Sequence, residues 1–193
     1  MTKFTAAVLQ MRSGVDPKAN AEVMAAMVAD AVAKGATYLQ TPEMTGMVQR
    51  DRAGLDAQLK GESDDVIVRT AADLARQHGV FIHVGSVAVA VEDRMIANRA
   101  FLFGPDGKRL TTYDKIHMFD VDLDNGESWR ESAAYQPGET ARVADLPFAR
   151  LGFAICYDVR FPALFRAEAL AGAVSTSAPS RASSRNSWGK RMS

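Results

Sequence analysis

The single cysteine, Cys156, stands where a nucleophile can be presented. It follows the apolar run 151–155 and precedes a predicted helix, which places it at a strand-to-helix turn. Such a turn exposes the side chain, leaves backbone N–H groups available to an oxyanion and puts the thiol near the positive end of a helix dipole. A buried structural cysteine is the commoner interpretation of one cysteine at a strand end. Cys156 alone therefore does not establish catalysis.

A thiol nucleophile needs a base, and the chain has three histidines to offer. His78 lies at a predicted helix C-terminus, where a cation suits the helix dipole. His83 lies in the middle of a predicted strand, and only His117 lies just past a strand end. A cysteine–histidine thiol protease that uses His117 is thus one hypothesis.

Two charged residues offer a different route. Glu43 follows the predicted strand 36–40, and Lys115 follows the predicted strand 109–113. Ligands of α/β sheets bind at the carboxyl ends of strands. Either residue alone is more often a solvated charge at a strand end. Together with Cys156, however, they supply a base, a cation and a nucleophile at three strand ends.

Alternating apolar residues and helix-capping signals predict the framework that would position these groups. Strands are expected at 4–11, 36–40, 80–89, 98–103 and 109–113, followed by a hairpin of 141–146 and 149–155. Helices are expected at 18–34, 63–78 and 161–170, the first with the N-cap pair Asp16-Pro17 and the C-terminal Gly35. This order predicts an α/β fold with antiparallel additions.

The composition is that of one ordinary globular domain. The 193 residues include 23 basic and 23 acidic side chains, so the net charge is zero, which excludes a strongly basic nucleic-acid binder. One cysteine excludes an internal disulfide and a multi-cysteine zinc site. We find no signal-peptide pattern and no apolar run of ~18 residues, and we expect a cytoplasmic protein without membrane or nucleic-acid partners.

Three separated motifs, in order, resemble the nitrilase superfamily of carbon–nitrogen hydrolases. They are residues 41–43 (TPE), 113–120 (YDKIHMFD) and 152–162 (GFAICYDVRFP). The second and third look like the branch of omega-amidases and deaminated-glutathione amidases. The resemblance covers residues 4 to about 173. It implies a four-layer α-β-β-α sandwich, incomplete at its C-terminal end, a small-molecule amide substrate and no metal or organic cofactor.

The resemblance also implies roles for three residues. Glu43 would be the general base, Lys115 would stabilise the tetrahedral intermediate, and Cys156 would be the nucleophile that forms a thioester. The expected reaction is hydrolysis of the amide of a small carboxylic acid.

Supporting roles are implied for the neighbouring residues. A second glutamate that supports the lysine matches Glu131 best, with Glu127 as the alternative. The backbone N–H of Tyr157 would donate to the oxyanion. For Arg160 we expect a structural role, pairing with Asp158 or another nearby carboxylate, rather than a contact to substrate.

The last 20 residues differ from the rest in composition. Residues 174–193 hold seven serines, against five in the preceding 173 residues, with four basic and no acidic side chains. We predict a partial carbon–nitrogen hydrolase domain at 1–173 and a disordered, non-homologous Ser/Arg-rich tail at 174–193, as in a truncated or frameshifted member. Full-length relatives are expected to form homo-oligomers. The alternative to an enzyme is a catalytically impaired remnant that acts only as an interaction module.

Overall fold

The computed structural model describes residues 3–49, 51–92, 95–122, 126 and 128–180. The helices are α1 (Pro17–Ala33), α2 (Arg52–Gln58), α3 (Val66–His78) and α4 (Pro162–Leu170), with short 3₁₀ helices η1 (Glu62–Asp64), η3 (Glu131–Ala133) and η4 (Cys156–Arg160). The strands are β1 (Ala6–Val8), β2 (Tyr38–Gln40), β3 (Phe81–Ala90), β4 (Ile96–Phe103), β5 (Arg109–Asp114), β6 (Asp120–Asp122), β7 (Ser128–Arg130), β8 (Val143–Asp145), β9 (Arg150–Phe153) and β10 (Ser175–Ser177).

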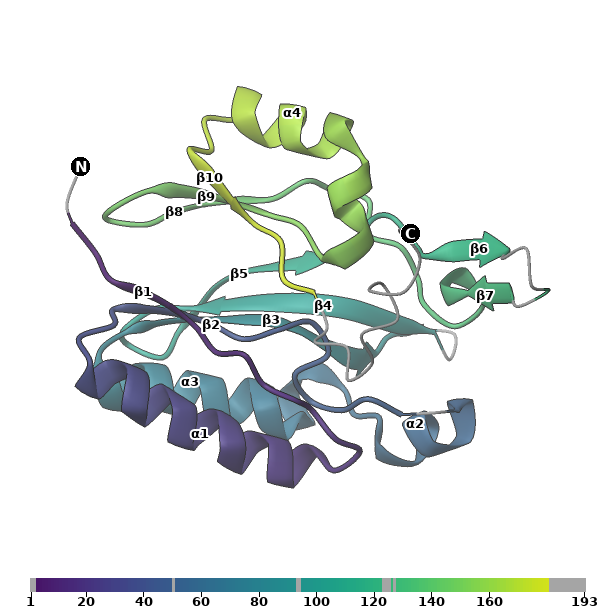
Figure 1. Ribbon diagram of the computed structural model, residues 1–193, viewed down its shortest axis with the longest axis horizontal. Helices are drawn as coiled ribbons and strands as arrows, with labels where there is room; N and C mark the ends of the chain where they lie inside the picture. The colour runs from purple at the N-terminus through teal and green to yellow at the C-terminus, as the bar shows by residue number, and fades with distance from the viewer. Residues whose placement is uncertain (1–2, 50, 93–94, 123–125, 127, 181–193) are drawn as a thin grey trace, which may run out of the picture.

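Two sheets lie face to face between two layers of helix (Figure 1). The larger sheet has the order β1-β2-β3-β4-β5, parallel from β1 to β3 and antiparallel from β3 to β5. The smaller sheet has the order β10-β9-β8, and β6 pairs with β7 beside it. Helices α1 and α3 cover the outer face of the larger sheet, and α4 covers the smaller one. The expected four-layer α-β-β-α arrangement is confirmed.

Local capping chemistry fixes the ends of the two long helices. The Asp16 carboxylate accepts the Lys18 N–H at the start of α1, and Asp65 accepts two N–H groups at the start of α3. Gly35 and Gly79 follow these helices with φ of +87° and +66°, a conformation that glycine adopts without steric cost. The helix boundaries are therefore encoded locally.

Alternation along β4 separates two hydrophobic cores. Ala97 and Phe101 pack in the core beneath α1 and α3, whereas Ala100 and Leu102 pack in the core between the sheets. The inter-sheet core continues into the smaller sheet through Phe153. Cys156 and Ile116 pack against this inter-sheet core.

The separate tail expected after Ala173 needs correction at residues 174–180. Residues 175–177 form β10, which pairs in parallel with β9, and the Ser177 hydroxyl donates to the Gln40 side chain at 2.7 Å. Strand pairing uses backbone groups, which serine possesses like any residue, so a serine-rich composition did not reveal it. The rest of the predicted tail, residues 181–193, lies outside the described residues.

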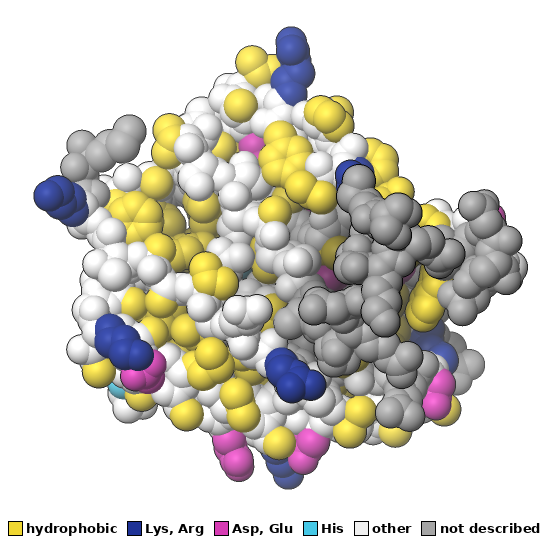
Figure 2. Space-filling view, viewed as in Figure 1, with side chains coloured by type: hydrophobic (Ala, Val, Ile, Leu, Met, Phe, Trp, Pro, Cys, Tyr) yellow, Lys and Arg dark blue, Asp and Glu magenta, His cyan; other side chains and the backbone are white. Residues whose placement is uncertain are grey.

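The surface is mixed in character. On the face shown in Figure 2, the Lys and Arg side chains stand apart from one another, some of them beside an Asp or Glu side chain, with apolar and uncharged surface between them. Among the described residues, no helix is both long enough and apolar enough to cross a membrane.

Candidate active site

Cys156 occupies a strained turn directly after the smaller sheet. Its φ is +49°, in the left-handed region that non-glycine residues rarely adopt. Its N–H donates to the Pro179 carbonyl at 2.9 Å, so the chain after β10 helps to hold this conformation. Strained residues of this kind cluster at functional sites, and a tight turn of this type presents a nucleophile.

Glu43 lies just past β2 on a tightly held loop and is buried, with 8% of its surface exposed. Met44, the next residue, has a φ of +53°, and its N–H donates to the Ser86 hydroxyl at 3.0 Å. The Thr45 N–H donates to the Ser86 carbonyl at 2.8 Å. These bonds to β3 fix the direction in which the Glu43 carboxylate points.

Lys115 follows β5 and is almost fully buried. Its ammonium donates to both carboxylate oxygens of Glu131, at 2.9 and 2.7 Å, and lies 3.6 Å from Glu43 Oε1. Glu131 begins η3 and also accepts the Phe119 N–H at 2.7 Å. The lysine is thus held between two carboxylates, and Glu131 is the second glutamate at the cluster. The alternative, Glu127, lies outside the described residues.

Burial and charge set the protonation of the cluster. Burial alone would lower the pKa of Lys115, but the charges of Glu43 and Glu131 outweigh it and raise that pKa, so the ammonium is retained. Burial, followed by the Glu43 charge, raises the pKa of the Cys156 thiol to about 12, and the thiol is hydrogen-bonded to Glu43. At neutral pH the cysteine is therefore a thiol, and its hydrogen-bond partner Glu43 is the side chain that could receive its proton.

Asp158 and Asn98 belong to the surroundings of this cluster, and sequence reasoning missed the function of both. The buried Asp158 carboxylate accepts bonds from Tyr113, from Ile155 and from His117. Asn98 Nδ2 donates to Glu43 Oε1 at 3.1 Å. One signal was readable: Asn98 is an amide on a strand face that otherwise carries Ala100 and Leu102.

The contacts of His117 are with Asp158 and Phe161, and they are not those of a base paired with a cysteine. Its Nδ1 lies 2.7 Å from Asp158 Oδ1, and its ring stacks on Phe161 with centroids 3.7 Å apart. Glu43, by contrast, is the group hydrogen-bonded to the Cys156 thiol. The geometry favours a carboxylate base over a histidine.

Two further predicted residues lie on η4. Tyr157 follows the nucleophile in the first turn, where the leading N–H groups of a helix have no partner within it. Its ring packs edge-on against Phe119 and Phe161. Arg160 is exposed, and no described residue pairs with it; Asp158 bonds elsewhere. Neither of the two pairings expected for Arg160, with Asp158 or with another nearby carboxylate, is found among the described residues.

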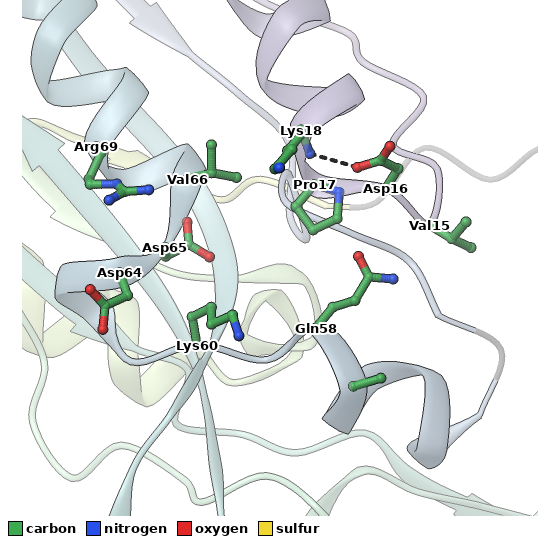
Figure 3. Close-up of a pocket in the computed structure, with 11 residues that line it drawn as sticks. Val15, Asp16, Pro17, Lys18, Gln58, Lys60, Asp64, Asp65, Val66 and Arg69 are labelled. Carbon is green, nitrogen blue, oxygen red and sulfur yellow. Dashed lines mark hydrogen bonds between the residues drawn. The ribbon is translucent and has the colours of Figure 1, made fainter.

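A cavity of about 670 Å³ opens between the start of α1, the end of α2 and the start of α3 (Figure 3). The charged residues that line it are Asp16, Lys18, Lys60, Asp64, Asp65 and Arg69. Three acidic and three basic groups balance, and two of the acids already cap helices. The cavity contains none of the clustered residues at the strand ends.

Comparison with known proteins places these residues in a family context. The carbon-nitrogen hydrolase family model matches residues 5–190. A deaminated glutathione amidase of Yersinia enterocolitica is 35% identical over 182 residues, covering 93% of this chain and 63% of the relative. The omega-amidase NIT2 of Danio rerio is 30% identical over 170 residues, covering 85% and 58%. The chain thus spans about three-fifths of the length of these curated relatives.

Solved structures agree. The NitFhit protein of C. elegans superposes with a TM-score of 0.82 at 27% identity, covering 92% of this chain and 43% of that one. An amidase of Nesterenkonia sp. AN1, a Glu-to-Gln variant with acrylamide added to its active-site cysteine, gives a TM-score of 0.79 at 26% identity, covering 92% and 67%. With the motifs, the fold and the family match in agreement, this chain belongs to the carbon-nitrogen hydrolase family.

Proposed function

We propose that this chain is an amidase that hydrolyses the C–N bond of the amide of a small carboxylic acid through a cysteine thioester. The observation that carries the proposal is the meeting of three groups from three strand ends. The Lys115 ammonium lies 3.6 Å from Glu43 Oε1, and the Cys156 thiol is hydrogen-bonded to Glu43. A base, a cation and a nucleophile are the parts that acyl transfer requires.

The first half of the reaction forms the thioester. Glu43 takes the proton of the Cys156 thiol as sulfur attacks the amide carbon, and the carbonyl oxygen becomes an oxyanion. The Lys115 ammonium and the Tyr157 N–H stabilise that charge. Glu43 then passes its proton to the amide nitrogen, the C–N bond breaks, and ammonia or an amine leaves.

The second half uses the same groups. Glu43 takes a proton from water, and the hydroxyl attacks the thioester carbon to give a second oxyanion at the same position. The intermediate expels the sulfur, which recovers its proton from Glu43 as the carboxylic acid forms. Throughout, Glu131 keeps Lys115 oriented and charged, which is supported by its two bonds of 2.7 and 2.9 Å.

The proposal is tested by ammonia release from a panel of omega-amides of short dicarboxylic acids, chosen because relatives carry the name omega-amidase. Release that depends on Cys156 supports it. A folded chain that releases no ammonia from any amide supports instead the remnant hypothesis, in which the domain only binds other chains.

A further inference from the structure

Asn98 is a polar side chain on an apolar face. It lies on β4, where it shares a face with Ala100 and Leu102, and only 1% of its surface is exposed. Burying an amide costs free energy unless its polar atoms are paired. An apolar side chain would fill the same place at lower cost, so packing does not account for the amide.

The contacts of Asn98 reach two members of the proposed triad. Its Nδ2 donates to Glu43 Oε1 at 3.1 Å, and its backbone carbonyl accepts the Lys115 N–H at 3.0 Å. The same Oε1 lies 3.6 Å from the Lys115 ammonium. One residue therefore fixes the strand end that carries the lysine and one oxygen of the carboxylate.

The orientation of the amide follows from the carboxylate. An ionised carboxylate only accepts hydrogen bonds, so the NH₂ group must face Glu43 and the amide oxygen must point away. That oxygen, Asn98 Oδ1, is buried and has no partner among the described residues. The hydrogen bond to Glu43 is thus made although it leaves the amide oxygen buried without a hydrogen bond, which costs free energy. A side chain selected for stability alone would not carry this cost.

We infer that Asn98 is a positioning residue for Glu43, an inference that rests on the proposed function. A neutral donor favours the ionised form of the carboxylate, the form that must receive a proton at the start of each half-reaction. It also fixes the plane of the carboxylate while the proton moves between Glu43 and Cys156. Acid–base catalysis depends on such geometry, since small misplacements cost large factors in rate.

Two variants and a matched control test this role. Asn98→Leu removes the donor, and Asn98→Asp keeps the shape but adds a like charge beside Glu43. The control, Asn20→Leu, replaces another buried asparagine, one that bonds to the backbone of Gly14 and Gly46. Thermal melting identifies the variants that fold, and if Asn98→Leu does not fold, the isosteric Asn98→Asp carries the test.

The expected result separates positioning from mere stability. Asn98→Leu should lower kcat about 10- to 100-fold with little change in KM. The acidic limb of kcat/KM should move to higher pH in Asn98→Leu, and further in Asn98→Asp, which adds a like charge. Asn20→Leu should lower the melting temperature without moving the limb. Unchanged kcat and limb in the Asn98 variants would overturn the inference and leave the proposed function standing.

A second readout needs no amide turnover. The rate at which iodoacetamide alkylates Cys156 is measured against pH in the same proteins. We expect its acidic limb to move to higher pH in the Asn98 variants and to stay in place in Asn20→Leu. If the wild-type chain hydrolyses no amide, the proposed function fails, whatever the alkylation experiment shows. If the acidic limb of the alkylation rate lies at the same pH in the wild type and in the Asn98 variants, the role of Asn98 in positioning Glu43 is refuted.

Discussion

The carboxylate of Asp158 binds the chain on both sides of Lys115. Asp158 Oδ2 accepts the Tyr113 hydroxyl at 2.7 Å, and Oδ1 accepts the His117 N–H at 2.9 Å. Oδ2 also accepts the N–H of Ile155, the residue before the nucleophile, at 2.9 Å. The turn that carries Cys156 and the strand end that carries the lysine are therefore tied together by one buried side chain.

Replacing His117 with alanine tests the histidine as a base. Because its Nδ1 is bonded to Asp158, we expect the loss of one partly buried contact, with kcat reduced by about tenfold or less and stability by about 1–2 kcal/mol. Ammonia release and thermal melting measure the two effects. A loss of kcat of about a thousandfold in a folded variant would revive the cysteine–histidine hypothesis.

Lys115→Arg tests the shape of the cation. The guanidinium is planar and larger than an ammonium, and Lys115 is only 2% exposed, which leaves little room for a larger group. An arginine at this position therefore cannot reach the oxyanion and both carboxylates from the same place. We expect kcat to fall about 100- to 1000-fold. Lys108→Arg, at an exposed lysine paired with Asp106, is the matched control and should keep full activity. Near-normal turnover by Lys115→Arg would mean that the ammonium does not meet the oxyanion.

Glu131→Gln tests the second carboxylate through pH. The Glu131 charge contributes to raising the pKa of Lys115, so its removal lowers that pKa. Lys115 acts only when protonated, that is, below its pKa; the alkaline limb of kcat/KM should therefore move to lower pH. We also expect kcat to fall about tenfold from looser positioning. An alkaline limb that stays at the same pH would show that the Glu131 charge does not raise the pKa of Lys115.

Deleting residues 174–193 tests the corrected C-terminal segment. The deletion removes β10 with its pairing to β9, the bond from Ser177 to Gln40 and the Pro179 carbonyl that accepts the Cys156 N–H. We expect the melting temperature to fall by ~5 °C or more, since about 1 kcal/mol corresponds to a few degrees at this size. An unchanged melting curve would restore the disordered tail that the composition suggested.

The parts of the fold that depend on local chemistry could be predicted from sequence. The cap at Asp16, the turns at Gly35 and Gly79 and the alternation in β4 lie where their residue types require. The strand β10 could not be predicted because its partner residues in β9 lie 24 positions away and two of its three residues are serines, which favour no regular element. For a three-residue strand, tertiary pairing outweighs intrinsic propensity.

The site divides in the same way. Glu43, Lys115 and Cys156 are recognisable because each follows a predicted strand, and the motifs around them match a family. Asn98 and Asp158 contact partners 55 and 41 residues away, in Glu43 and His117. An amide on an apolar strand face marks Asn98 as unusual, but the sequence does not show which residue it contacts.

The proposed thioester mechanism requires a covalent acyl group on Cys156. Wild-type protein mixed with an omega-amide that releases ammonia is quenched in acid within one turnover and measured by intact mass spectrometry, beside Cys156→Ala. We predict that the wild-type mass rises by the acyl group in place of the thiol hydrogen, with the adduct mapped to Cys156. The Cys156→Ala variant should show neither adduct nor ammonia. Ammonia release by Cys156→Ala at a rate near that of the wild type would contradict the thioester mechanism.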